Sequence, residues 1–281
     1  MKIYIANLDI ERTGGGWSFQ HNFYSSMGNL ITQDYNEADV YFITSPSMVS
    51  KEDVEQAKTD GKKIVLRIDN AVRNSRNRNT GMSRMKKFAD MADLVIYQST
   101  WAKNYLLPFT KADGRVILNG TDTSVFNTEG RSDNEDVLYS RFNRDETKNW
   151  EVARYWYSQY QLEHPDAKLN IIGQFSNELK EYNFDFYNNE NIQYSGVLDR
   201  RNLAKLYKAN GKFLYTYFND ACSNSLIEAL CCGCEIVGDE YYRETGGAPE
   251  ILHNFKLYGA DYYTNERMAT QYEEAINGII V

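Results

Sequence analysis

With 281 residues, 42% of them hydrophobic, the chain is long enough for one large or two ordinary globular domains, and nothing in it has the composition of a disordered segment. No run of about 18 apolar residues occurs, so we expect no membrane-spanning helix. The apolar start at residues 1–6 is too short, and charged residues follow it too soon, for a signal peptide, which favours a cytoplasmic protein. The net charge is −8 but uneven: residues 1–125 carry 16 basic and 14 acidic side chains, and residues 126–281 carry 15 and 25. The two halves are therefore expected to face different partners.

Short apolar runs alternate with longer amphipathic ones along most of the chain. The predicted strands are residues 2–6, 40–44, 63–68, 94–98, 115–118, 137–140, 168–172, 192–195, 213–217 and 235–237. The predicted helices are residues 17–28, 50–59, 81–91, 99–106, 146–162, 199–209, 223–232 and 264–278. This alternation indicates parallel sheets covered by helices on both faces.

Ten strands in two groups predict two doubly wound domains, residues 1–122 and 123–281, with the last helix, 264–278, as one that can pack back towards the first domain. Ligands of such sheets bind at the carboxyl ends of the strands. The four cysteines, all between residues 222 and 234, have neither the spacing nor the histidines of a zinc site. We expect them to be buried free thiols.

Basic residues follow the first strand of the second half, where the chain reads Ser-Arg141-Phe-Asn-Arg-Asp-Glu-Thr-Lys148. Arg141 at the strand end and Lys148 at the start of the next helix could hold a diphosphate between them. A solvated helix start is the alternative, because Asp145 and Glu146 suit a helix N-terminus.

Two carboxylates, Asp220 and Glu228, bracket a short polar loop and the first turn of an apolar helix. Carboxylates accept hydrogen bonds from hydroxyls, and the N–H groups that open a helix face anions, so the segment suits a ligand with both hydroxyls and phosphate. Glu228 lies among apolar residues and needs a partner, for which ribose hydroxyls or a structural salt bridge would serve.

Three glycine-containing turns also fall at strand ends. Gly15 and Gly16, in Thr-Gly-Gly-Gly after the first strand, would let the backbone approach a phosphate or sugar, and Gly196-Val197 could pack beside a flat base. A further turn, Gly-Gly-Ala-Pro-Glu, covers residues 246–250. Each turn by itself is also typical of an ordinary loop.

Together these segments resemble the retaining GT-B glycosyltransferases of family 4, which use nucleotide-diphosphate sugars, most closely over residues 115–251. The matching segments are Asn119-Gly-Thr-Asp with Phe126, Ser-Arg141 to Lys148, Gly196-Val197, Asp220 to Glu228 with the following residues to 237, and residues 246–251. The resemblance implies two Rossmann-like domains that face a central cleft. It also implies a donor site of Gly15, Gly16, Asn119, Arg141, Lys148, Gly196, Val197, Ser225, Leu226 and Glu228.

In the roles that this resemblance implies, Arg141, Lys148 and the N–H groups of Ser225 and Leu226 would hold the diphosphate, and Glu228 would bind the ribose. Asp220 would contact the transferred sugar as a catalytic-region residue. Two departures from the family pattern stand out: Asp220 replaces a glutamate, and Asp69 or Asn70 stands where the family often has a histidine.

The resemblance also implies retention at the anomeric carbon by front-face attack, without a protein nucleophile. No Asp-x-Asp occurs in the sequence, so we expect neither a metal nor a cofactor, only the nucleotide-diphosphate sugar as donor substrate. A non-catalytic sugar-nucleotide-binding subunit and a GT-B sugar-nucleotide epimerase are the alternatives to a hexosyl- or pentosyltransferase.

The acceptor is expected to bind the first domain, where basic residues gather between positions 67 and 87 with Asp69 as the one acid. Arg73, Arg76 and Arg78 are the predicted acceptor-binding residues. An anionic acceptor fits them, such as a hydroxylated base in phage DNA, which would place the protein in the host cytoplasm. A saccharide or lipid-linked glycan is the other candidate acceptor, and a solvated loop is the non-functional interpretation.

Overall fold

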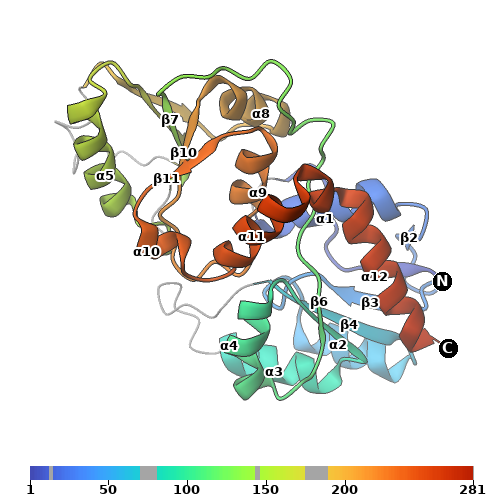
Figure 1. Cartoon of the computed structure of the whole chain (residues 1–281). Coiled ribbons are helices and arrows are strands. Elements are labelled where there is room, and N and C mark those ends of the chain that lie inside the picture. The colour runs from blue at the N-terminus through green and yellow to red at the C-terminus, as the bar shows by residue number, and fades with distance from the viewer. Residues whose placement is uncertain (13–14, 70–80, 143–145, 175–188, 281) are drawn as a thin grey trace. The chain divides into compact units, whose positions relative to one another are not determined.

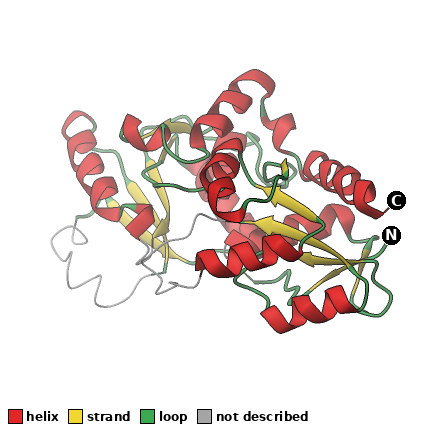
Figure 2. Ribbon diagram, turned by 90° about the horizontal axis from the view of Figure 1, so that it is seen from below, coloured by secondary structure: helices red, strands yellow, loops and turns green. Residues whose placement is uncertain are grey.

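The computed structural model describes residues 1–12, 15–69, 81–142, 146–174 and 189–280. The chain divides into two compact units, which we call unit 1 and unit 2 (Figure 1). Unit 1 consists of Met1–Asp122 and Asp261–Val281, and unit 2 of Thr123–Ala260. Each contains one parallel sheet accompanied by helices (Figure 2), so the predicted α/β class with two doubly wound sheets is confirmed.

Unit 1 has a six-stranded sheet in the order β2-β1-β3-β4-β5-β6. Its strands are β1 (Ile3–Ile5), β2 (Ile31–Thr32), β3 (Val40–Ile43), β4 (Lys63–Ile68), β5 (Leu94–Tyr97) and β6 (Arg115–Val116). Its helices are α1 (Gly15–Met27), α2 (Lys51–Thr59), α3 (Gly81–Met91), α4 (Thr100–Thr110) and α12 (Asn265–Ile280). A 3-10 turn at Ala260–Tyr263 begins at the last residue of unit 2 and continues into unit 1. The strand order reverses between β1 and β3, so the ligand-binding edge of this sheet lies where these two strands end.

Hydrophobic side chains cover both faces of this sheet because its strands are buried on both sides. On one face α1 and α12 pack together, and Tyr272 of α12 meets the rings of Phe19, Phe23 and Phe42 at centroid distances of 5.7, 5.2 and 5.7 Å. On the other face, residues of α2, α3 and α4 form a second core around Ile64 and Leu66. The last helix is thus part of the core of unit 1.

Unit 2 has a five-stranded sheet in the order β11-β10-β7-β8-β9. Its strands are β7 (Val137–Phe142), β8 (Leu169–Gly173), β9 (Ile192–Gly196), β10 (Lys212–Leu214) and β11 (Glu235–Val237). Its helices are α5 (Trp150–Glu163), α8 (Arg200–Ala209), α9 (Asn224–Cys231), α10 (Glu240–Arg243) and α11 (Ala248–Tyr258), with a 3-10 turn at Glu146–Lys148. Here the order reverses between β7 and β10, which places the ends of these two strands at the edge where ligands bind.

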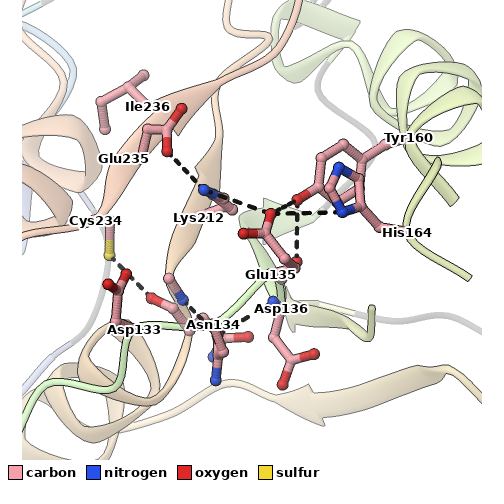
Figure 3. Close-up of polar contacts among 12 residues, drawn as sticks. Asp133, Asn134, Glu135, Asp136, Tyr160, His164, Lys212, Cys234, Glu235 and Ile236 are labelled. Atoms are coloured by element: carbon pink, nitrogen blue, oxygen red, sulfur yellow. Dashed lines mark hydrogen bonds and ion pairs between the residues drawn. The ribbon is translucent and has the colours of Figure 1, made fainter. Parts of the chain in front are cut away.

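Charged side chains connect the amino ends of the strands in unit 2, at the opposite edge of the sheet (Figure 3). Lys212, which opens β10, is 2.6 Å from Glu235 of β11 and 3.5 Å from Glu135, which precedes β7. Glu135 also accepts a hydrogen bond from Tyr160 and is 3.8 Å from the His164 ring. The Tyr160 hydrogen bond, followed by the Lys212 and His164 charges, lowers the pKa of Glu135. A mostly buried Lys212 and its more exposed acidic partners thus connect the strand starts at the edge opposite the strand ends.

The structure agrees with most predicted elements. The main differences are the missed elements β2, α10 and α11, a longer α4, a β10 that ends at Leu214, and a 3-10 turn in place of the first residues of the helix predicted at 146–162. Strand β2 has only two residues, too few for a periodic signal. Helix α4 continues past Pro108 to Thr110, because a proline in the last turn removes only one helical hydrogen bond. Helix α11 was missed because Pro249 looked like part of a loop, whereas it lies in the first turn of the helix, where proline fits well. Within the described residues, no helix combines the length and the apolar character needed to cross a membrane.

Tyr272 tests the contribution of α12 to unit 1. Replacing this fully buried ring with alanine removes its contacts with three phenylalanines, so Tyr272→Ala should lower the free energy of unfolding by about 3–5 kcal/mol. Glu273→Ala on the exposed side of the same helix should change it by less than about 0.5 kcal/mol. Chemical denaturation followed by circular dichroism would measure both, and equal effects of the two changes would contradict this packing.

Candidate functional site

Arg141 lies in a bulge near the end of β7. The register of β7 against β8 shifts between Tyr139 and Phe142, and Arg141 has a left-handed backbone with φ of 64°. A non-glycine residue in this conformation costs of order 1–3 kcal/mol and persists only where the surroundings hold it. Bulges of this kind re-aim a side chain, here towards the edge where β7 and β10 end.

Lys148 is buried against the neighbouring strand of the switch point. Its carbonyl accepts hydrogen bonds from the Tyr139 hydroxyl at 2.8 Å and the Thr216 hydroxyl at 2.9 Å, which fixes the backbone. Its ammonium group lies 4.2 Å from the centroid of the Tyr217 ring, within the range of a cation–π interaction. Tyr217, whose ring lies beneath this charge, was not among the residues predicted from the sequence.

Asp220 brings the two predicted cations together. Its Oδ2 is 2.9 Å from Lys148 Nζ and 3.8 Å from Arg141 Nη1. Burial by itself would lower the pKa of Arg141, but nearby acidic groups, led by Asp220, together outweigh this effect and raise it, so the guanidinium stays charged. Three of the residues predicted from sequence thus form one charged cluster.

The loop after α10 holds the backbone of Asp220 in place. The Gly247 N–H donates to the Asp220 carbonyl at 2.8 Å. Gly246 has φ of 65°, and a Cβ there would lie 2.5 Å from the same carbonyl oxygen. Only glycine fits this approach, which explains why the second glycine turn follows the acidic motif in the sequence.

Helix α9 begins at Asn224, four residues after Asp220. Ser223 is its N-cap, and the Ser223 hydroxyl accepts from the Leu226 N–H at 3.4 Å. The N–H groups of Ser225 and Leu226, both predicted to hold phosphate, lie in the first turn of this helix, whose positive end attracts anions, and the Leu226 N–H is already bonded to the cap.

Glu228 lies one turn further along α9 and is only 6% exposed. Burial raises its pKa to about 7, although the charges of Arg200 and Arg141 and the hydroxyl of Tyr207 act in the opposite direction. The acid and the cluster around Asp220 therefore share Arg141 as a neighbour. Arg200 and Tyr207, both on α8, were not among the predicted residues, because their positions in sequence carry no local signal.

Gly196 ends β9 and Val197 follows it, at the same edge of the sheet. Gly196 has φ of 68° and Val197 is 56% exposed, so the turn presents a small apolar surface. Helix α8 starts three residues later with Arg200, whose charge acts on Glu228. The predicted base-contacting turn is thus linked to the acid through α8.

Unit 1 contains a second, largely neutral polar network at the carboxyl edge of its own sheet. Arg67 of β4 is only 1% exposed and lies with its guanidinium carbon 3.7 Å from the centroid of the Phe19 ring. It donates to the Thr44 carbonyl at 2.9 Å and to Asn119 Oδ1 at 3.0 Å. Asn119 in turn donates to Gln98 at 3.0 Å. The predicted donor-binding residue Asn119 therefore has its amide engaged inside unit 1.

The remaining predicted residues of unit 1 are distributed around this edge. Gly16 lies in the first turn of α1, after Gly15, and a Cβ on Gly16 would be 3.3 Å from the Met48 sulfur. Asp69 follows the last residue of β4 and is partly buried.

The predicted basic patch between residues 67 and 87 is wrong for Arg67, whereas Arg84 and Lys87 on α3 are exposed. Arg67 is buried rather than part of a surface patch, because it belongs to a strand covered on both faces. Arg73, Arg76, Arg78 and Asn70 lie outside the described residues.

All four cysteines are buried and free. Burial raises the pKa of Cys231 and of Cys234 to about 12, which keeps them protonated thiols at neutral pH. Over the described part of the chain, no group of three or more histidine, cysteine, aspartate or glutamate side chains is arranged to hold a metal ion.

No protein-family model matches the sequence, and the search of curated proteins finds no match. Solved structures do match. HepE from Anabaena in complex with UDP aligns with a TM-score of 0.74 over 99% of this chain and 100% of that one, at 12% identity. Sucrose-phosphate synthase from Thermosynechococcus elongatus aligns with 0.65 over 94% of this chain and 78% of that one, at 14% identity.

The pneumococcal O-GlcNAc transferase GtfA, in complex with UDP and GlcNAc, aligns with a TM-score of 0.61 over 86% of this chain and 57% of that one, at 14% identity. These similar structures are GT-B glycosyltransferases, so the fold of this chain is of the GT-B type. The fold class predicted from the sequence is confirmed.

Gly246 and Gly130 offer a matched test of the loop behind Asp220. Both have positive φ, 65° and 71°, but a Cβ on Gly130 meets nothing within 4 Å. Gly130→Ala should cost about 1–2 kcal/mol of unfolding free energy for the left-handed backbone alone. Gly246→Ala should cost roughly 1–3 kcal/mol more, because its methyl group must displace the Asp220 backbone. Denaturant titration of both variants gives the comparison, and equal losses would argue against the close approach.

Proposed function

We propose that this chain is a glycosyltransferase that moves a sugar from a nucleotide-diphosphate sugar to an acceptor hydroxyl. One observation carries the proposal: Arg141, Lys148 and Asp220 meet within ion-pair distance at the switch-point edge of unit 2, just before the N-terminus of α9. Two cations and a helix N-terminus suit a diphosphate, and Glu228 further along α9 suits hydroxyl donors.

Within this proposal, Arg141 and Lys148 bind the diphosphate, and the N–H groups of Ser225 and Leu226 contribute hydrogen bonds to it. Glu228 accepts hydrogen bonds from the ribose, and the Gly196-Val197 turn packs beside the base. Uracil is the base we favour, since the similar structures of HepE and GtfA contain UDP. Asp220, which contacts both cations, would also reach hydroxyls of the transferred sugar.

The proposed reaction breaks the bond between the anomeric carbon and the diphosphate oxygen, and forms one to the acceptor oxygen. Negative charge then grows on the leaving diphosphate, and Arg141 with Lys148 stabilises it without reorganising, because both are already held in place. The leaving phosphate accepts the acceptor's proton. This chemistry needs no metal in the charge balance, and we propose retention of anomeric configuration from the resemblance of residues 115–251 to retaining enzymes.

Unit 1 is the proposed acceptor-side domain. Gly15 and Gly16 would approach the donor with their backbone. Asn119 would contact the donor with an amide that Arg67 and Gln98 orient, and Asp69 would act near the acceptor hydroxyl. A saccharide or lipid-linked glycan is the acceptor we favour, with a hydroxylated base in DNA as the alternative that a basic stretch containing Arg73 would accommodate.

Nucleotide binding tests the proposal directly. A thermal-shift screen of UDP, GDP and ADP with their sugars should identify a ligand that, at a hundred times its dissociation constant, adds about 2.7 kcal/mol of stability. Arg141→Ala should weaken that ligand by roughly 10- to 100-fold, the cost of losing a charge-assisted hydrogen bond. Calorimetric titration measures the change.

Arg154→Ala is the matched control, because Arg154 is on α5 and pairs only locally with Glu151 at 2.7 Å. It should leave nucleotide affinity unchanged. Sugar transfer is then assayed as release of the nucleoside diphosphate and by the anomeric configuration of the product. Unchanged affinity in Arg141→Ala would refute the diphosphate assignment, and binding without release across the common sugars would identify a non-catalytic subunit instead.

The raised pKa of Glu228 predicts a pH dependence of donor binding. The acid has a pKa of about 7 in the folded chain against a usual 4.5, so it is largely protonated at pH 6 and ionised at pH 8. An ionised carboxylate accepts stronger hydrogen bonds from ribose hydroxyls. Affinity for UDP-glucose should therefore rise about threefold to tenfold between pH 6 and pH 8, as titration calorimetry would show.

Glu228→Gln is the control for this dependence, since the amide does not titrate and its binding curve should be flat over the same range. The raised pKa of Glu228 also makes the stability of the unliganded protein fall, rather than rise, with increasing pH. The folded state holds the Glu228 proton more tightly than the unfolded state, so this group contributes stability below about pH 4.5 that is lost as pH rises to about 7. A binding profile that falls with pH would contradict the ribose role of Glu228.

A further inference from the structure

Asp220 already occupies the position in which an incoming phosphate would meet the two cations. A single carboxylate oxygen, Oδ2, lies 2.9 Å from Lys148 Nζ and 3.8 Å from Arg141 Nη1. The side chains of Lys148 and Asp220 are 6% and 11% exposed, so the ion pair between them is shielded from solvent. Water screens it little, and the attraction is stronger than that of a surface pair.

The backbone of Asp220 cannot retreat from this position. Its carbonyl accepts from Gly247 at 2.8 Å, and Gly246 packs against its main-chain atoms. The preceding residue, Asn219, has a left-handed backbone with φ of 51°. Because the main chain is fixed, the carboxylate can move only by rotation of a short side chain between staggered positions.

Lys148 is equally constrained. Its carbonyl is held by Tyr139 and Thr216, and its ammonium rests over the Tyr217 ring. A buried ammonium without an anion would be costly, so Asp220 supplies the charge that stabilises Lys148 when no ligand is bound. A diphosphate that binds the same cations brings negative charge next to the Asp220 carboxylate, and like charges so close repel.

We propose that the Asp220 carboxylate is a fixed counter-ion that competes with the diphosphate for Lys148 and Arg141 and so lowers the affinity for nucleotide. The inference rests on the proposed donor site and adds a consequence to it. When no ligand is bound, the Asp220 carboxylate keeps the two cations charged and in place. After sugar transfer, it lowers the affinity for the nucleoside diphosphate that remains. It thereby favours product release, at the expense of tight donor binding.

Removing only the charge tests this role. Asp220→Asn keeps the size of the side chain, and Asp220→Ser gives a second neutral variant should the first fold poorly. Calorimetric titration at fixed low salt compares UDP with uridine, which has the same base and ribose but no phosphate. We expect both neutral variants to bind UDP roughly three- to tenfold more tightly than the wild type, with uridine affinity within twofold.

Asp220→Glu is the charge-retaining control, and its affinity for UDP should stay at or below that of the wild type. Unchanged or weaker UDP binding in the neutral variants would overturn the inference, because Asp220 would then position the cations for phosphate rather than compete with it. Equal tightening of UDP and uridine would overturn it as well, since the effect would not act through the phosphates. If no nucleotide binds wild type or variants, the donor site itself is refuted, an outcome distinct from the other two.

Discussion

The structure of unit 2 depends on the need to keep two largely buried cations charged. Lys148 and Arg141 have lost most of their contact with water, and the carboxylate of Asp220 between them offsets that loss. The bulge at Arg141, the hydrogen bonds to the Lys148 carbonyl and the close approach of Gly246 all fix parts of this one cluster. Strained backbone is tolerated here because many contacts determine it together, which is typical of functional sites.

The two units hold their buried cations in different ways. Unit 2 places opposite charges together at its switch point, whereas the buried Arg67 of unit 1 makes its described contacts with neutral groups: the Thr44 carbonyl, the Asn119 amide and the Phe19 ring. Delocalised charge and five donors allow a guanidinium to be held in this manner. Both networks lie where parallel strands end, because that edge exposes unpaired backbone groups and helix N-termini to a ligand.

Much of the architecture could be predicted from local sequence. Strands 63–68 and 235–237 were predicted with the bounds that the structure shows. The first is a buried parallel strand, which has a largely continuous apolar run. The errors occurred where a local signal has two meanings. Pro249 marks a loop or a first helical turn, and Arg67, read among many basic residues, suggested a surface patch although it belongs to a buried strand. Such ambiguities are resolved by tertiary packing, which a single sequence does not display.

The sequence by itself determined the alternation of strands and helices, the apolar faces that build two cores, and the residue types from which an anion-binding site is made. Only the tertiary structure decided that β10 lies beside β7, so that Asp220 reaches Arg141 and Lys148, and that the last helix belongs to the core of unit 1. It also decided that Arg200 and Tyr207 are neighbours of Glu228. The physical reason is that helix and strand formation depend on nearby residues, while strand pairing and charge burial depend on contacts between residues far apart in the chain.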